Sequence, residues 1–470
     1  MELSRAQAVL ATLILYKLAL VAIGLWARRR THDQGDFFLG GRRLGATVAA
    51  ISASASSSSA WTLLGVSGAA YAWGLSAVWL FPATVSGFAL NWLWVAPRLK
   101  RLSREQGSVT LTEVLAHDAG GTARLSIERA ASLIVLFSFL FYIASQFQAA
   151  GDAFQSSFGL GATSSIVIGG GIIILYTLLG GFWAVSVTDT LQGLLMALTA
   201  VVLPAAAVGA AGGVAGIRQG LAAAGDPALL SWTGVHAGWL ALAFVCGTLG
   251  IGLGYPGQPH VVNRFMAIKD DAALSRGRVI ALAWAAIVYA GMITLGWAGR
   301  ALITTLGNEE QILFSAANQL FPPVVAGVMI AAVLSAIMST ADSQLLVAGS
   351  SVAYDWRRSS PGSGSSLALS RVVVLVLSLV AILIALFAPQ AIFSRVLFAW
   401  HAVGSAFGPL LLVRLAGRRV RPPVVLASML VGFVITVVFH LQPNSPGDFA
   451  ERLLPFALAL ALAWLGSKRP

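Results

Sequence analysis

Charge and cysteine are both scarce in this chain of 470 residues. Asp, Glu, Lys and Arg together make up 10% of it, whereas hydrophobic residues make up 57%. Soluble domains average about 25% charged residues, so this chain has too little charge to cover a surface that faces water. Cys246 is the only cysteine, which excludes an intrachain disulfide and a thiolate metal cluster. The composition therefore predicts a polytopic membrane protein.

Motifs for nucleotide binding and hydrolytic catalysis are also missing. The sequence contains no GxxxxGK[ST] loop, no HExxH pair and no CxxC pair. The gaps between apolar segments are too short for a soluble domain. We therefore expect neither an enzyme nor an ATP-driven pump, and we expect no organic cofactor.

What the sequence does contain is a series of apolar segments of about 20 residues, the length that crosses a bilayer. They predict an all-α polytopic fold with about 13 transmembrane helices in a single membrane domain, 1–470. The predicted spans have their centres near Leu15, Ser59, Ser86, Tyr142, Ile173, Ala197, Gly247, Ile287, Ala336, Leu377, Ala402, Val431 and Ala459.

The net charge of +12 is distributed unevenly between the two sides of these spans. With the N-terminus outside, 24 of the 30 Lys and Arg residues lie on one side, five lie on the other and Lys17 lies within the first span. This asymmetry is the positive-inside signal. We expect a multi-pass protein of the plasma (inner) membrane with a cytoplasmic C-terminus, in contact with lipid and not with nucleic acid. The predicted cytoplasmic clusters are Arg28–Arg30, Lys100–Arg104, Arg276–Arg278, Arg357–Arg358 and Arg418–Arg421.

Two predicted spans contain residues that disfavour a continuous helix. Ser52–Ala60 is a run of serine and alanine, and Gly250–Pro259 combines four glycines with two prolines. Open backbone at membrane depth is tolerated where it lines a cavity or is buried in protein. Close packing of small residues between helices is the alternative explanation of each run.

The positions of these two breaks predict an inverted repeat. They lie five spans apart, and each opens a set of five spans, 44–212 and 237–416. Because five is odd, the second set crosses the membrane in the opposite direction, as in inverted-repeat transporters. Residues 8–27 and 422–467 would then form additional helices.

The apolar segment Ala331–Tyr354 carries a carboxylate, Asp342, among several hydroxyl groups. A charge within a spanning helix costs several kcal/mol and usually serves a transport pathway or an ion. Four of the small residues share one face of this helix, namely Ala336, Ser339, Thr340 and Ser343. The segment is therefore predicted to form one wall of a small-cation site.

Oxygen ligands for sodium, a hard cation, are available from two segments. Ser339 and Thr340 would supply hydroxyl groups, and Ala336 a carbonyl where its helix is distorted. The carbonyls of Ala55 and Ser58, freed by the first break, would complete the site. This arrangement needs no charged side chain.

Three further groups of residues are candidates for function. Asp189 is predicted to lie in a short connection before the sixth span, and with Asp342 and Ser343 it would form a further cation site or an exit path; a helix cap is the alternative. Tyr142 and Gln146 share a face of the fourth span and would hydrogen-bond a polar solute, unless they only join helices. His260, after the second break, is assigned a capping role.

Four stretches resemble the sodium/solute symporter family, closest to its sodium/proline symporter branch. The resemblance implies a LeuT-type fold of inverted five-helix repeats and sodium-coupled import of a small organic solute by alternating access. That solute would be an amino acid such as proline, or a related carboxylate. The matching stretches are Asp36–Gly45, Gly180–Asp189, Gly252–His260 and Met338–Thr340.

The resemblance also assigns individual residues. It implies one sodium site at Ala55, Ser58, Ala336, Ser339 and Thr340, and a second one, held by some relatives, at Asp189, Ser339, Asp342 and Ser343. Arg42 matches a position that matters to transport in relatives. The candidate substrate residues are Ser57, Tyr142, Gln146, Ile251 and Tyr255. Proline symporters carry an aspartate where this chain has Ser57 and a tryptophan where it has Ile251.

Two other functions remain alternatives on this reasoning. A protein with a transporter fold can act as a solute sensor for a signalling partner, and a symporter can be driven by protons instead of sodium. No obligate protein partner is evident from the sequence. The sequence leaves open whether one or two sodium ions move in each cycle.

Overall fold

The computed structural model describes residues 5–28, 39–177, 182–352, 367–388 and 390–469. The predicted basic cluster at 357–358, most of the one at 28–30, and parts of the first two matching stretches lie outside the described residues. Within the described part, the chain is almost entirely helical. A single antiparallel pair joins strands β1 (Arg419–Val420) and β2 (Ser467–Lys468) there.

The helical elements follow one another in a single series, which includes short 3-10 and π segments labelled η. Their bounds are α1 (Arg5–Arg28), η1 (Gly40–Arg42), α3 (Ala46–Ser57), η2 (Trp61–Gly65), α4 (Val66–Trp73), η3 (Gly74–Trp79), α5 (Leu80–Ala89), η4 (Leu90–Val95), α6 (Ala96–Gln106), α7 (Leu111–Ala116), α8 (Gly121–Phe158), α9 (Ala162–Thr177), α10 (Phe182–Ala210), α11 (Gly213–Ala223), η5 (Pro227–Leu230), α12 (Gly238–Leu249), η6 (Gly250–Gly257), α13 (Pro259–Ala267), α14 (Asp271–Leu302), η7 (Glu309–Gln311), α15 (Ile312–Leu320), α16 (Pro323–Ser350), α17 (Leu367–Phe387), α18 (Ile392–Leu415), α19 (Pro422–His440), η9 (Pro446–Asp448) and α20 (Phe449–Leu465).

In the described part of the chain, eight helical segments are long and apolar enough to cross a membrane. The protein is therefore a multi-pass membrane protein. Ser59 lies at an interruption between α3 and η2, and every other predicted span centre lies inside a helical element. The number of crossings, about 13, stays a prediction.

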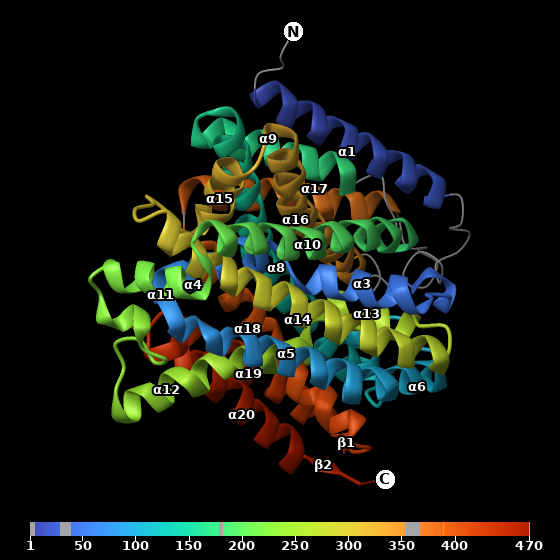
Figure 1. The fold of residues 1–470 in the computed structure, drawn as a ribbon. Helices are drawn as coiled ribbons and strands as arrows, with labels where there is room; N and C mark the ends of the chain where they lie inside the picture. The colour runs from blue at the N-terminus through green and yellow to red at the C-terminus, as the bar shows by residue number, and fades with distance from the viewer. Residues whose placement is uncertain (1–4, 29–38, 178–181, 353–366, 389, 470) are drawn as a thin grey trace.

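The helices pack side by side around α8, α16 and α18 (Figure 1). The most apolar stretches of α18 and α16 are 94% and 83% buried, whereas that of α19 is only 28% buried. In Figure 1, α1 lies at the top edge of the bundle and α20 at the bottom edge. The outer helices thus shield α16 and α18 from lipid, whereas α19 exposes most of its apolar surface to lipid.

The first break interrupts the helix as the serine run predicts. Helix α3 ends at Ser57, and Ser58 has non-helical dihedral angles of φ −119° and ψ 85°. The N–H groups freed beyond it find side-chain acceptors, because Ala60 donates to Gln146 Oε1 at 3.1 Å and Trp61 to Ser59 Oγ at 3.2 Å. Open backbone is therefore buried in protein here, which is the condition for tolerating it in a membrane.

The second break combines a change of helix type with close packing. Helix α12 gives way to the 3-10 segment η6, and α13 starts at Pro259. A Cβ atom on Gly254 would lie 2.1 Å from Trp400 Nε1, and one on Gly257 would lie 2.6 Å from the Gly404 carbonyl oxygen. These glycines let η6 lie directly against α18, which supports the close-packing explanation of this run.

Candidate functional site

The hydroxyl group of Ser339 on α16 lies between two backbone carbonyls. Its Oγ is 3.2 Å from the carbonyl oxygen of Ala55, at the end of α3, and 3.2 Å from that of Ala336. One residue further on, Thr340 Oγ1 donates to the Ser56 carbonyl at 3.2 Å. All five residues are buried. The structure thus brings α16 against the carbonyl end of α3 through the two predicted hydroxyl groups.

This oxygen-rich junction suits a hard monovalent cation. The carbonyl oxygens of Ala55 and Ala336 both lie within hydrogen-bonding distance of Ser339 Oγ, and none of the three atoms carries a formal charge. A serine hydroxyl can turn its hydrogen away and offer a lone pair to an ion instead. Ser58 Oγ lies 3.4 Å from the Tyr289 hydroxyl, so the predicted role of Ser58 depends on its carbonyl group.

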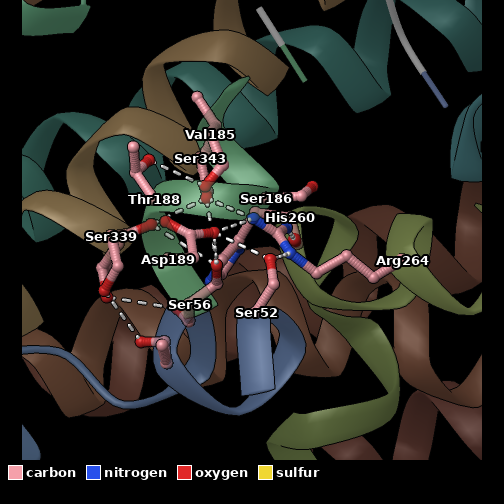
Figure 2. Close-up of polar contacts among 12 residues, drawn as sticks. Ser52, Ser56, Val185, Ser186, Thr188, Asp189, His260, Arg264, Ser339 and Ser343 are labelled. Carbon is pink, nitrogen blue, oxygen red and sulfur yellow. Dashed lines mark hydrogen bonds and ion pairs between the residues drawn. The ribbon is translucent and has the colours of Figure 1, made fainter. Parts of the chain in front are cut away.

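A second polar cluster surrounds Asp189 (Figure 2). Its Oδ2 accepts hydrogen bonds from Ser52 Oγ at 2.8 Å, Ser56 Oγ at 3.1 Å and Arg264 Nη2 at 2.8 Å. The side chains of Asp189 and Arg264 are 0% and 2% exposed. Asp189 Oδ1 is buried and makes no hydrogen bond. Among the described residues, Oδ1 therefore has no donor, and it could accept a further ligand.

The predicted location of Asp189 was wrong. Helix α10 begins at Phe182, so Asp189 lies two turns inside a helix and neither in a connection nor at a cap (Figure 2). The apolar residues between Phe182 and Asp189 extend the helix toward its N-terminus. The carboxylate therefore lies within the bundle, against α3.

Sequence reasoning missed Arg264. The guanidinium of Arg264 reaches from α13 to Ser52 Oγ at 2.7 Å and Ser343 Oγ at 2.6 Å, as well as to Asp189. Ser343 in turn donates to the Ser339 carbonyl at 2.7 Å. A buried carboxylate needs a cationic partner, so placing Asp189 inside the bundle would have predicted a buried Arg or Lys beside it.

Asp342 is buried beside this cluster on α16, with 1% of its surface exposed. A cavity of about 20 Å³ borders the cluster and is lined by Arg264, Ser343 and His260, among others. That volume accommodates one water-sized species.

Two of the candidate substrate residues meet the first break directly. Tyr142 donates to Ser59 Oγ at 3.3 Å, and Gln146 accepts the N–H of Ala60 at 3.1 Å. Both contacts reach from α8 to the non-helical stretch. Tyr142 and Gln146 therefore do join α8 to the first break in this conformation.

The other three candidates make different contacts. The hydroxyl of Tyr255 is 3.1 Å from that of Tyr289, which sequence reasoning missed and which also lies 3.2 Å from Thr62 Oγ1. The Ile251 carbonyl accepts from Trp400 Nε1 at 3.3 Å. Ser57 Oγ turns back to the Ser54 carbonyl at 2.9 Å.

The capping role assigned to His260 was wrong. Gln258 is the N-cap of α13, and no side chain caps it. The imidazole ring instead meets Phe139, Tyr142 and Trp400 edge-on, with ring centroids 5.3, 6.3 and 6.5 Å away. Proline at the first position of α13 needs no N–H partner, so a histidine cap is not required there.

Hydrogen bonds also connect the residues that precede α3 with α6 and α13. Arg42 donates to Ser103 Oγ at 3.0 Å and to the Ser108 carbonyl at 2.8 Å. Leu44 pairs with the end of α13 through the Ala267 carbonyl at 3.1 Å and the N–H of Lys269 at 3.1 Å. These bonds tie the start of α3 to α6 and α13.

The carboxylate of Glu310 joins η7 to the start of α18. Glu310 in η7 accepts the N–H groups of Ile392 at 2.9 Å and Phe393 at 2.7 Å, and so caps the N-terminus of α18. Burial raises the pKa of Glu310 above its ordinary value, although both hydrogen bonds oppose this effect. A Cβ on Gly68 would lie 2.9 Å from Glu310 Cα, so α4 packs directly on this turn.

The sequence is similar to a known family of membrane transporters. The sequence profile of the sodium:solute symporter family matches residues 37–432. The high-affinity proline transporter of Bacillus subtilis is 34% identical over 455 residues, which cover 94% of both chains. The sodium/proline symporter of Escherichia coli is 31% identical over 443 residues, covering 92% of this chain and 87% of its own.

A solved structure has a similar fold. It is a Na⁺-coupled sialic acid symporter in a substrate-bound, outward-open state, and it superposes with a TM-score of 0.81. The superposition covers 98% of this chain and 99% of that one, at 20% sequence identity. The two chains therefore share their overall helical architecture.

Proposed function

Because this chain belongs to the sodium:solute symporter family and imports a small solute together with sodium, we propose that the solute is a zwitterionic amino acid, with proline as the first candidate. The two relatives named above are proline transporters, and this chain matches them over 94% and 87% of their length. They favour neither the solute sensor nor the proton-driven alternative. Like them, the protein is a transporter and not an enzyme.

The chemistry of the five candidate substrate residues supports a zwitterion over an anion. Ser57, Tyr142, Gln146, Ile251 and Tyr255 carry no charge. A solute with a net charge would lose its hydration without gaining a counter-charge, which costs several kcal/mol. A zwitterion instead matches the two ends of a broken helix, because carbonyls favour its ammonium group and N–H groups its carboxylate.

The proposed sodium site lies between α3 and α16, with the Ala55, Ser58 and Ala336 carbonyls and the Ser339 and Thr340 hydroxyls as ligands. The observation that carries it is the position of Ser339 Oγ, 3.2 Å from two carbonyl oxygens on two different helices. An ion there would link the helices more strongly than one hydroxyl hydrogen does. Sodium binding would then favour the arrangement of α3 that receives the solute.

A second sodium site is proposed at Asp189, Ser339, Asp342 and Ser343. Arg264 now donates to Asp189 and Ser343, and a sodium ion beside it would meet a positive charge. The ion and the guanidinium would therefore compete for the same oxygens. Occupancy of this site requires Arg264 to withdraw, which would also loosen the contact of α13 with α3 and α10.

The proposed architecture is a single membrane domain, 1–470, with inverted repeats at 44–212 and 237–416. Additional helices at 8–27 and 422–467 would bring the crossings to about 13. In support, an interrupted helical stretch starts each set, at Ser58 and at η6. The basic clusters would then be cytoplasmic and the N-terminus outside. Alternating access would proceed by movement of one set of helices against the other.

Equilibrium binding of labelled proline to the purified protein tests the solute assignment. We expect binding in sodium and at least tenfold weaker binding when potassium replaces it, because the two ligands stabilise the same state. Other small zwitterionic amino acids should displace proline, whereas monocarboxylates of the same size should not. Displacement by a monocarboxylate would contradict the zwitterion proposal.

A further inference from the structure

A basic pocket of about 520 Å³ lies where α6 meets the start of α14, away from the sodium and solute sites. Four cationic side chains and one carboxylate line it, together with a few apolar groups. The charged residues of this pocket are Lys100, Arg101, Arg104, Arg278 and Asp271. Positive charge is therefore in excess, and nothing in the transport mechanism uses it.

Two of these four cations, Arg104 and Arg278, have only neutral partners among the described residues. Lys100 pairs with Asp271 at 2.6 Å, which accounts for the single carboxylate. Arg104 donates to the carbonyls of Ile268 at 2.9 Å and Lys269 at 2.8 Å. Carbonyl groups orient a guanidinium without neutralising it, so the charge of Arg104 still acts on its surroundings.

The other two guanidiniums, those of Arg101 and Arg278, are at most weakly compensated by the described residues. Arg278 Nε lies 3.3 Å from the Trp92 carbonyl oxygen. The side chain of Arg101 is 76% exposed and forms a loose ion pair with Glu105, at 3.8 Å, which water screens. Burial lowers the pKa of Arg42 nearby, and the charge of Arg104 lowers it further. The pocket therefore holds a positive field that an anion would relieve.

The apolar surface beside the pocket indicates its depth in the membrane. Leu93, two helical turns before Lys100, is 49% exposed, and Val279, next to Arg278, is 67% exposed. The Arg98 guanidinium lies 4.6 Å from the centre of the Trp94 ring, and tryptophan beside a basic residue is typical of the headgroup level. The pocket thus opens where hydrocarbon meets headgroups.

We propose that this pocket binds the phosphodiester headgroup of an anionic phospholipid. Guanidinium groups match phosphate oxygens in pairs, and basic pockets between transmembrane helices on the cytoplasmic side suit such headgroups. The exposed apolar side chains favour a lipid over a soluble phosphate, because acyl chains would cover them. A bound headgroup would join α6 to α14, close to the bonds that fix Leu44 against α13.

Lipid binding to the full-length protein in neutral detergent tests the proposal without any transport assay. Phosphatidylglycerol is titrated against the thermal unfolding midpoint, with phosphatidylcholine and inorganic phosphate as parallel arms. We expect phosphatidylglycerol alone to raise the midpoint. The double variant R101Q/R278Q should bind it about 25-fold more weakly, since each basic residue contributes roughly fivefold.

Two further variants separate charge from folding. R276Q removes a guanidinium from an exposed position on the same end of α14 that does not line the pocket, and it should change binding less than twofold. R101K/R278K keeps both charges and should retain binding within about fivefold. If R101Q/R278Q binds as tightly as the unmodified protein, or if R276Q weakens binding equally, the pocket is not the site. If inorganic phosphate stabilises as well as the lipid does, the ligand is a soluble phosphate.

Discussion

Asp189 and Arg264 form an ion pair that is almost inaccessible to water and lies at the meeting point of four helices, α3, α10, α13 and α16. The two residues are 75 positions apart in the chain, so no local pattern predicts their contact. A local pattern could have placed Asp189 correctly, because an apolar run precedes it. The hydroxyl pattern of Ser339 and Thr340, in contrast, correctly indicated which face of α16 meets α3.

Replacing either member of this pair should destabilise the protein more than replacing both. Asp189→Asn or Arg264→Gln alone leaves a buried charge without its partner, which costs about 3–5 kcal/mol. The double variant D189N/R264Q removes both charges and keeps hydrogen-bonding groups, so it should regain much of that loss. Thermal unfolding of the four proteins in detergent measures the coupling. Losses that simply add would mean that the charges do not interact.

At the scale of elements, the two interrupted helices differ in a way that composition alone did not reveal. The serine run opens the chain at Ser58, and the side chains of Gln146 on α8 and of Ser59 accept the freed N–H groups. The glycine run stays helical as η6 but packs tightly on α18. Serine and glycine both predicted a break, whereas the partner helix decides which kind forms.

Packing of η6 on α18 should make Gly254 intolerant of a side chain. Gly254→Ala would place its Cβ 2.1 Å from Trp400 Nε1, an overlap that costs about 1–3 kcal/mol of stability. The control is Gly171→Ala on α9, where a Cβ meets no atom within 4 Å. That change should be neutral or slightly stabilising. Equal unfolding midpoints for the two variants would show that the close approach is not required.

Burial of Glu310, which caps α18, should make stability depend on pH. Because burial raises its pKa above the ordinary 4.5, the folded protein holds this proton more tightly than the unfolded chain does. This tighter proton binding contributes fully to the free energy of unfolding below about pH 4.5. The contribution is lost as pH rises through the raised pKa, with a slope of at most about 1.4 kcal/mol per pH unit.

Glu310→Gln should remove this part of the pH dependence and lower stability by roughly 1 kcal/mol, because an amide accepts fewer N–H bonds than a carboxylate. Glu309→Gln, at the exposed neighbouring position, removes a charge that adds a smaller upward effect to the pKa of Glu310, so it should change the pH profile much less than Glu310→Gln does. Unfolding midpoints between pH 4 and 8 test both. A parallel profile for Glu310→Gln and the unmodified protein would contradict the assignment.

At the scale of the whole molecule, the scarcity of charge and the spacing of apolar segments predicted a multi-pass helical protein, and the structure confirms it. The family follows equally from local motifs. Contacts between distant segments did not follow, among them Tyr289 with the first break and Glu310 with α18. They depend on how helices pack, which a single chain's periodicity does not encode.

Sodium-driven uptake into proteoliposomes tests the central claim most directly. An inward sodium gradient should drive accumulation of labelled proline, and Ser339→Ala should raise the sodium concentration for half-maximal uptake about tenfold, for the loss of one ligand oxygen. Ser335→Ala, one turn away on α16 and bonded to Ala331, should leave that concentration unchanged. Accumulation under a proton gradient but not under sodium, or an unaltered sodium dependence in Ser339→Ala, would contradict the account.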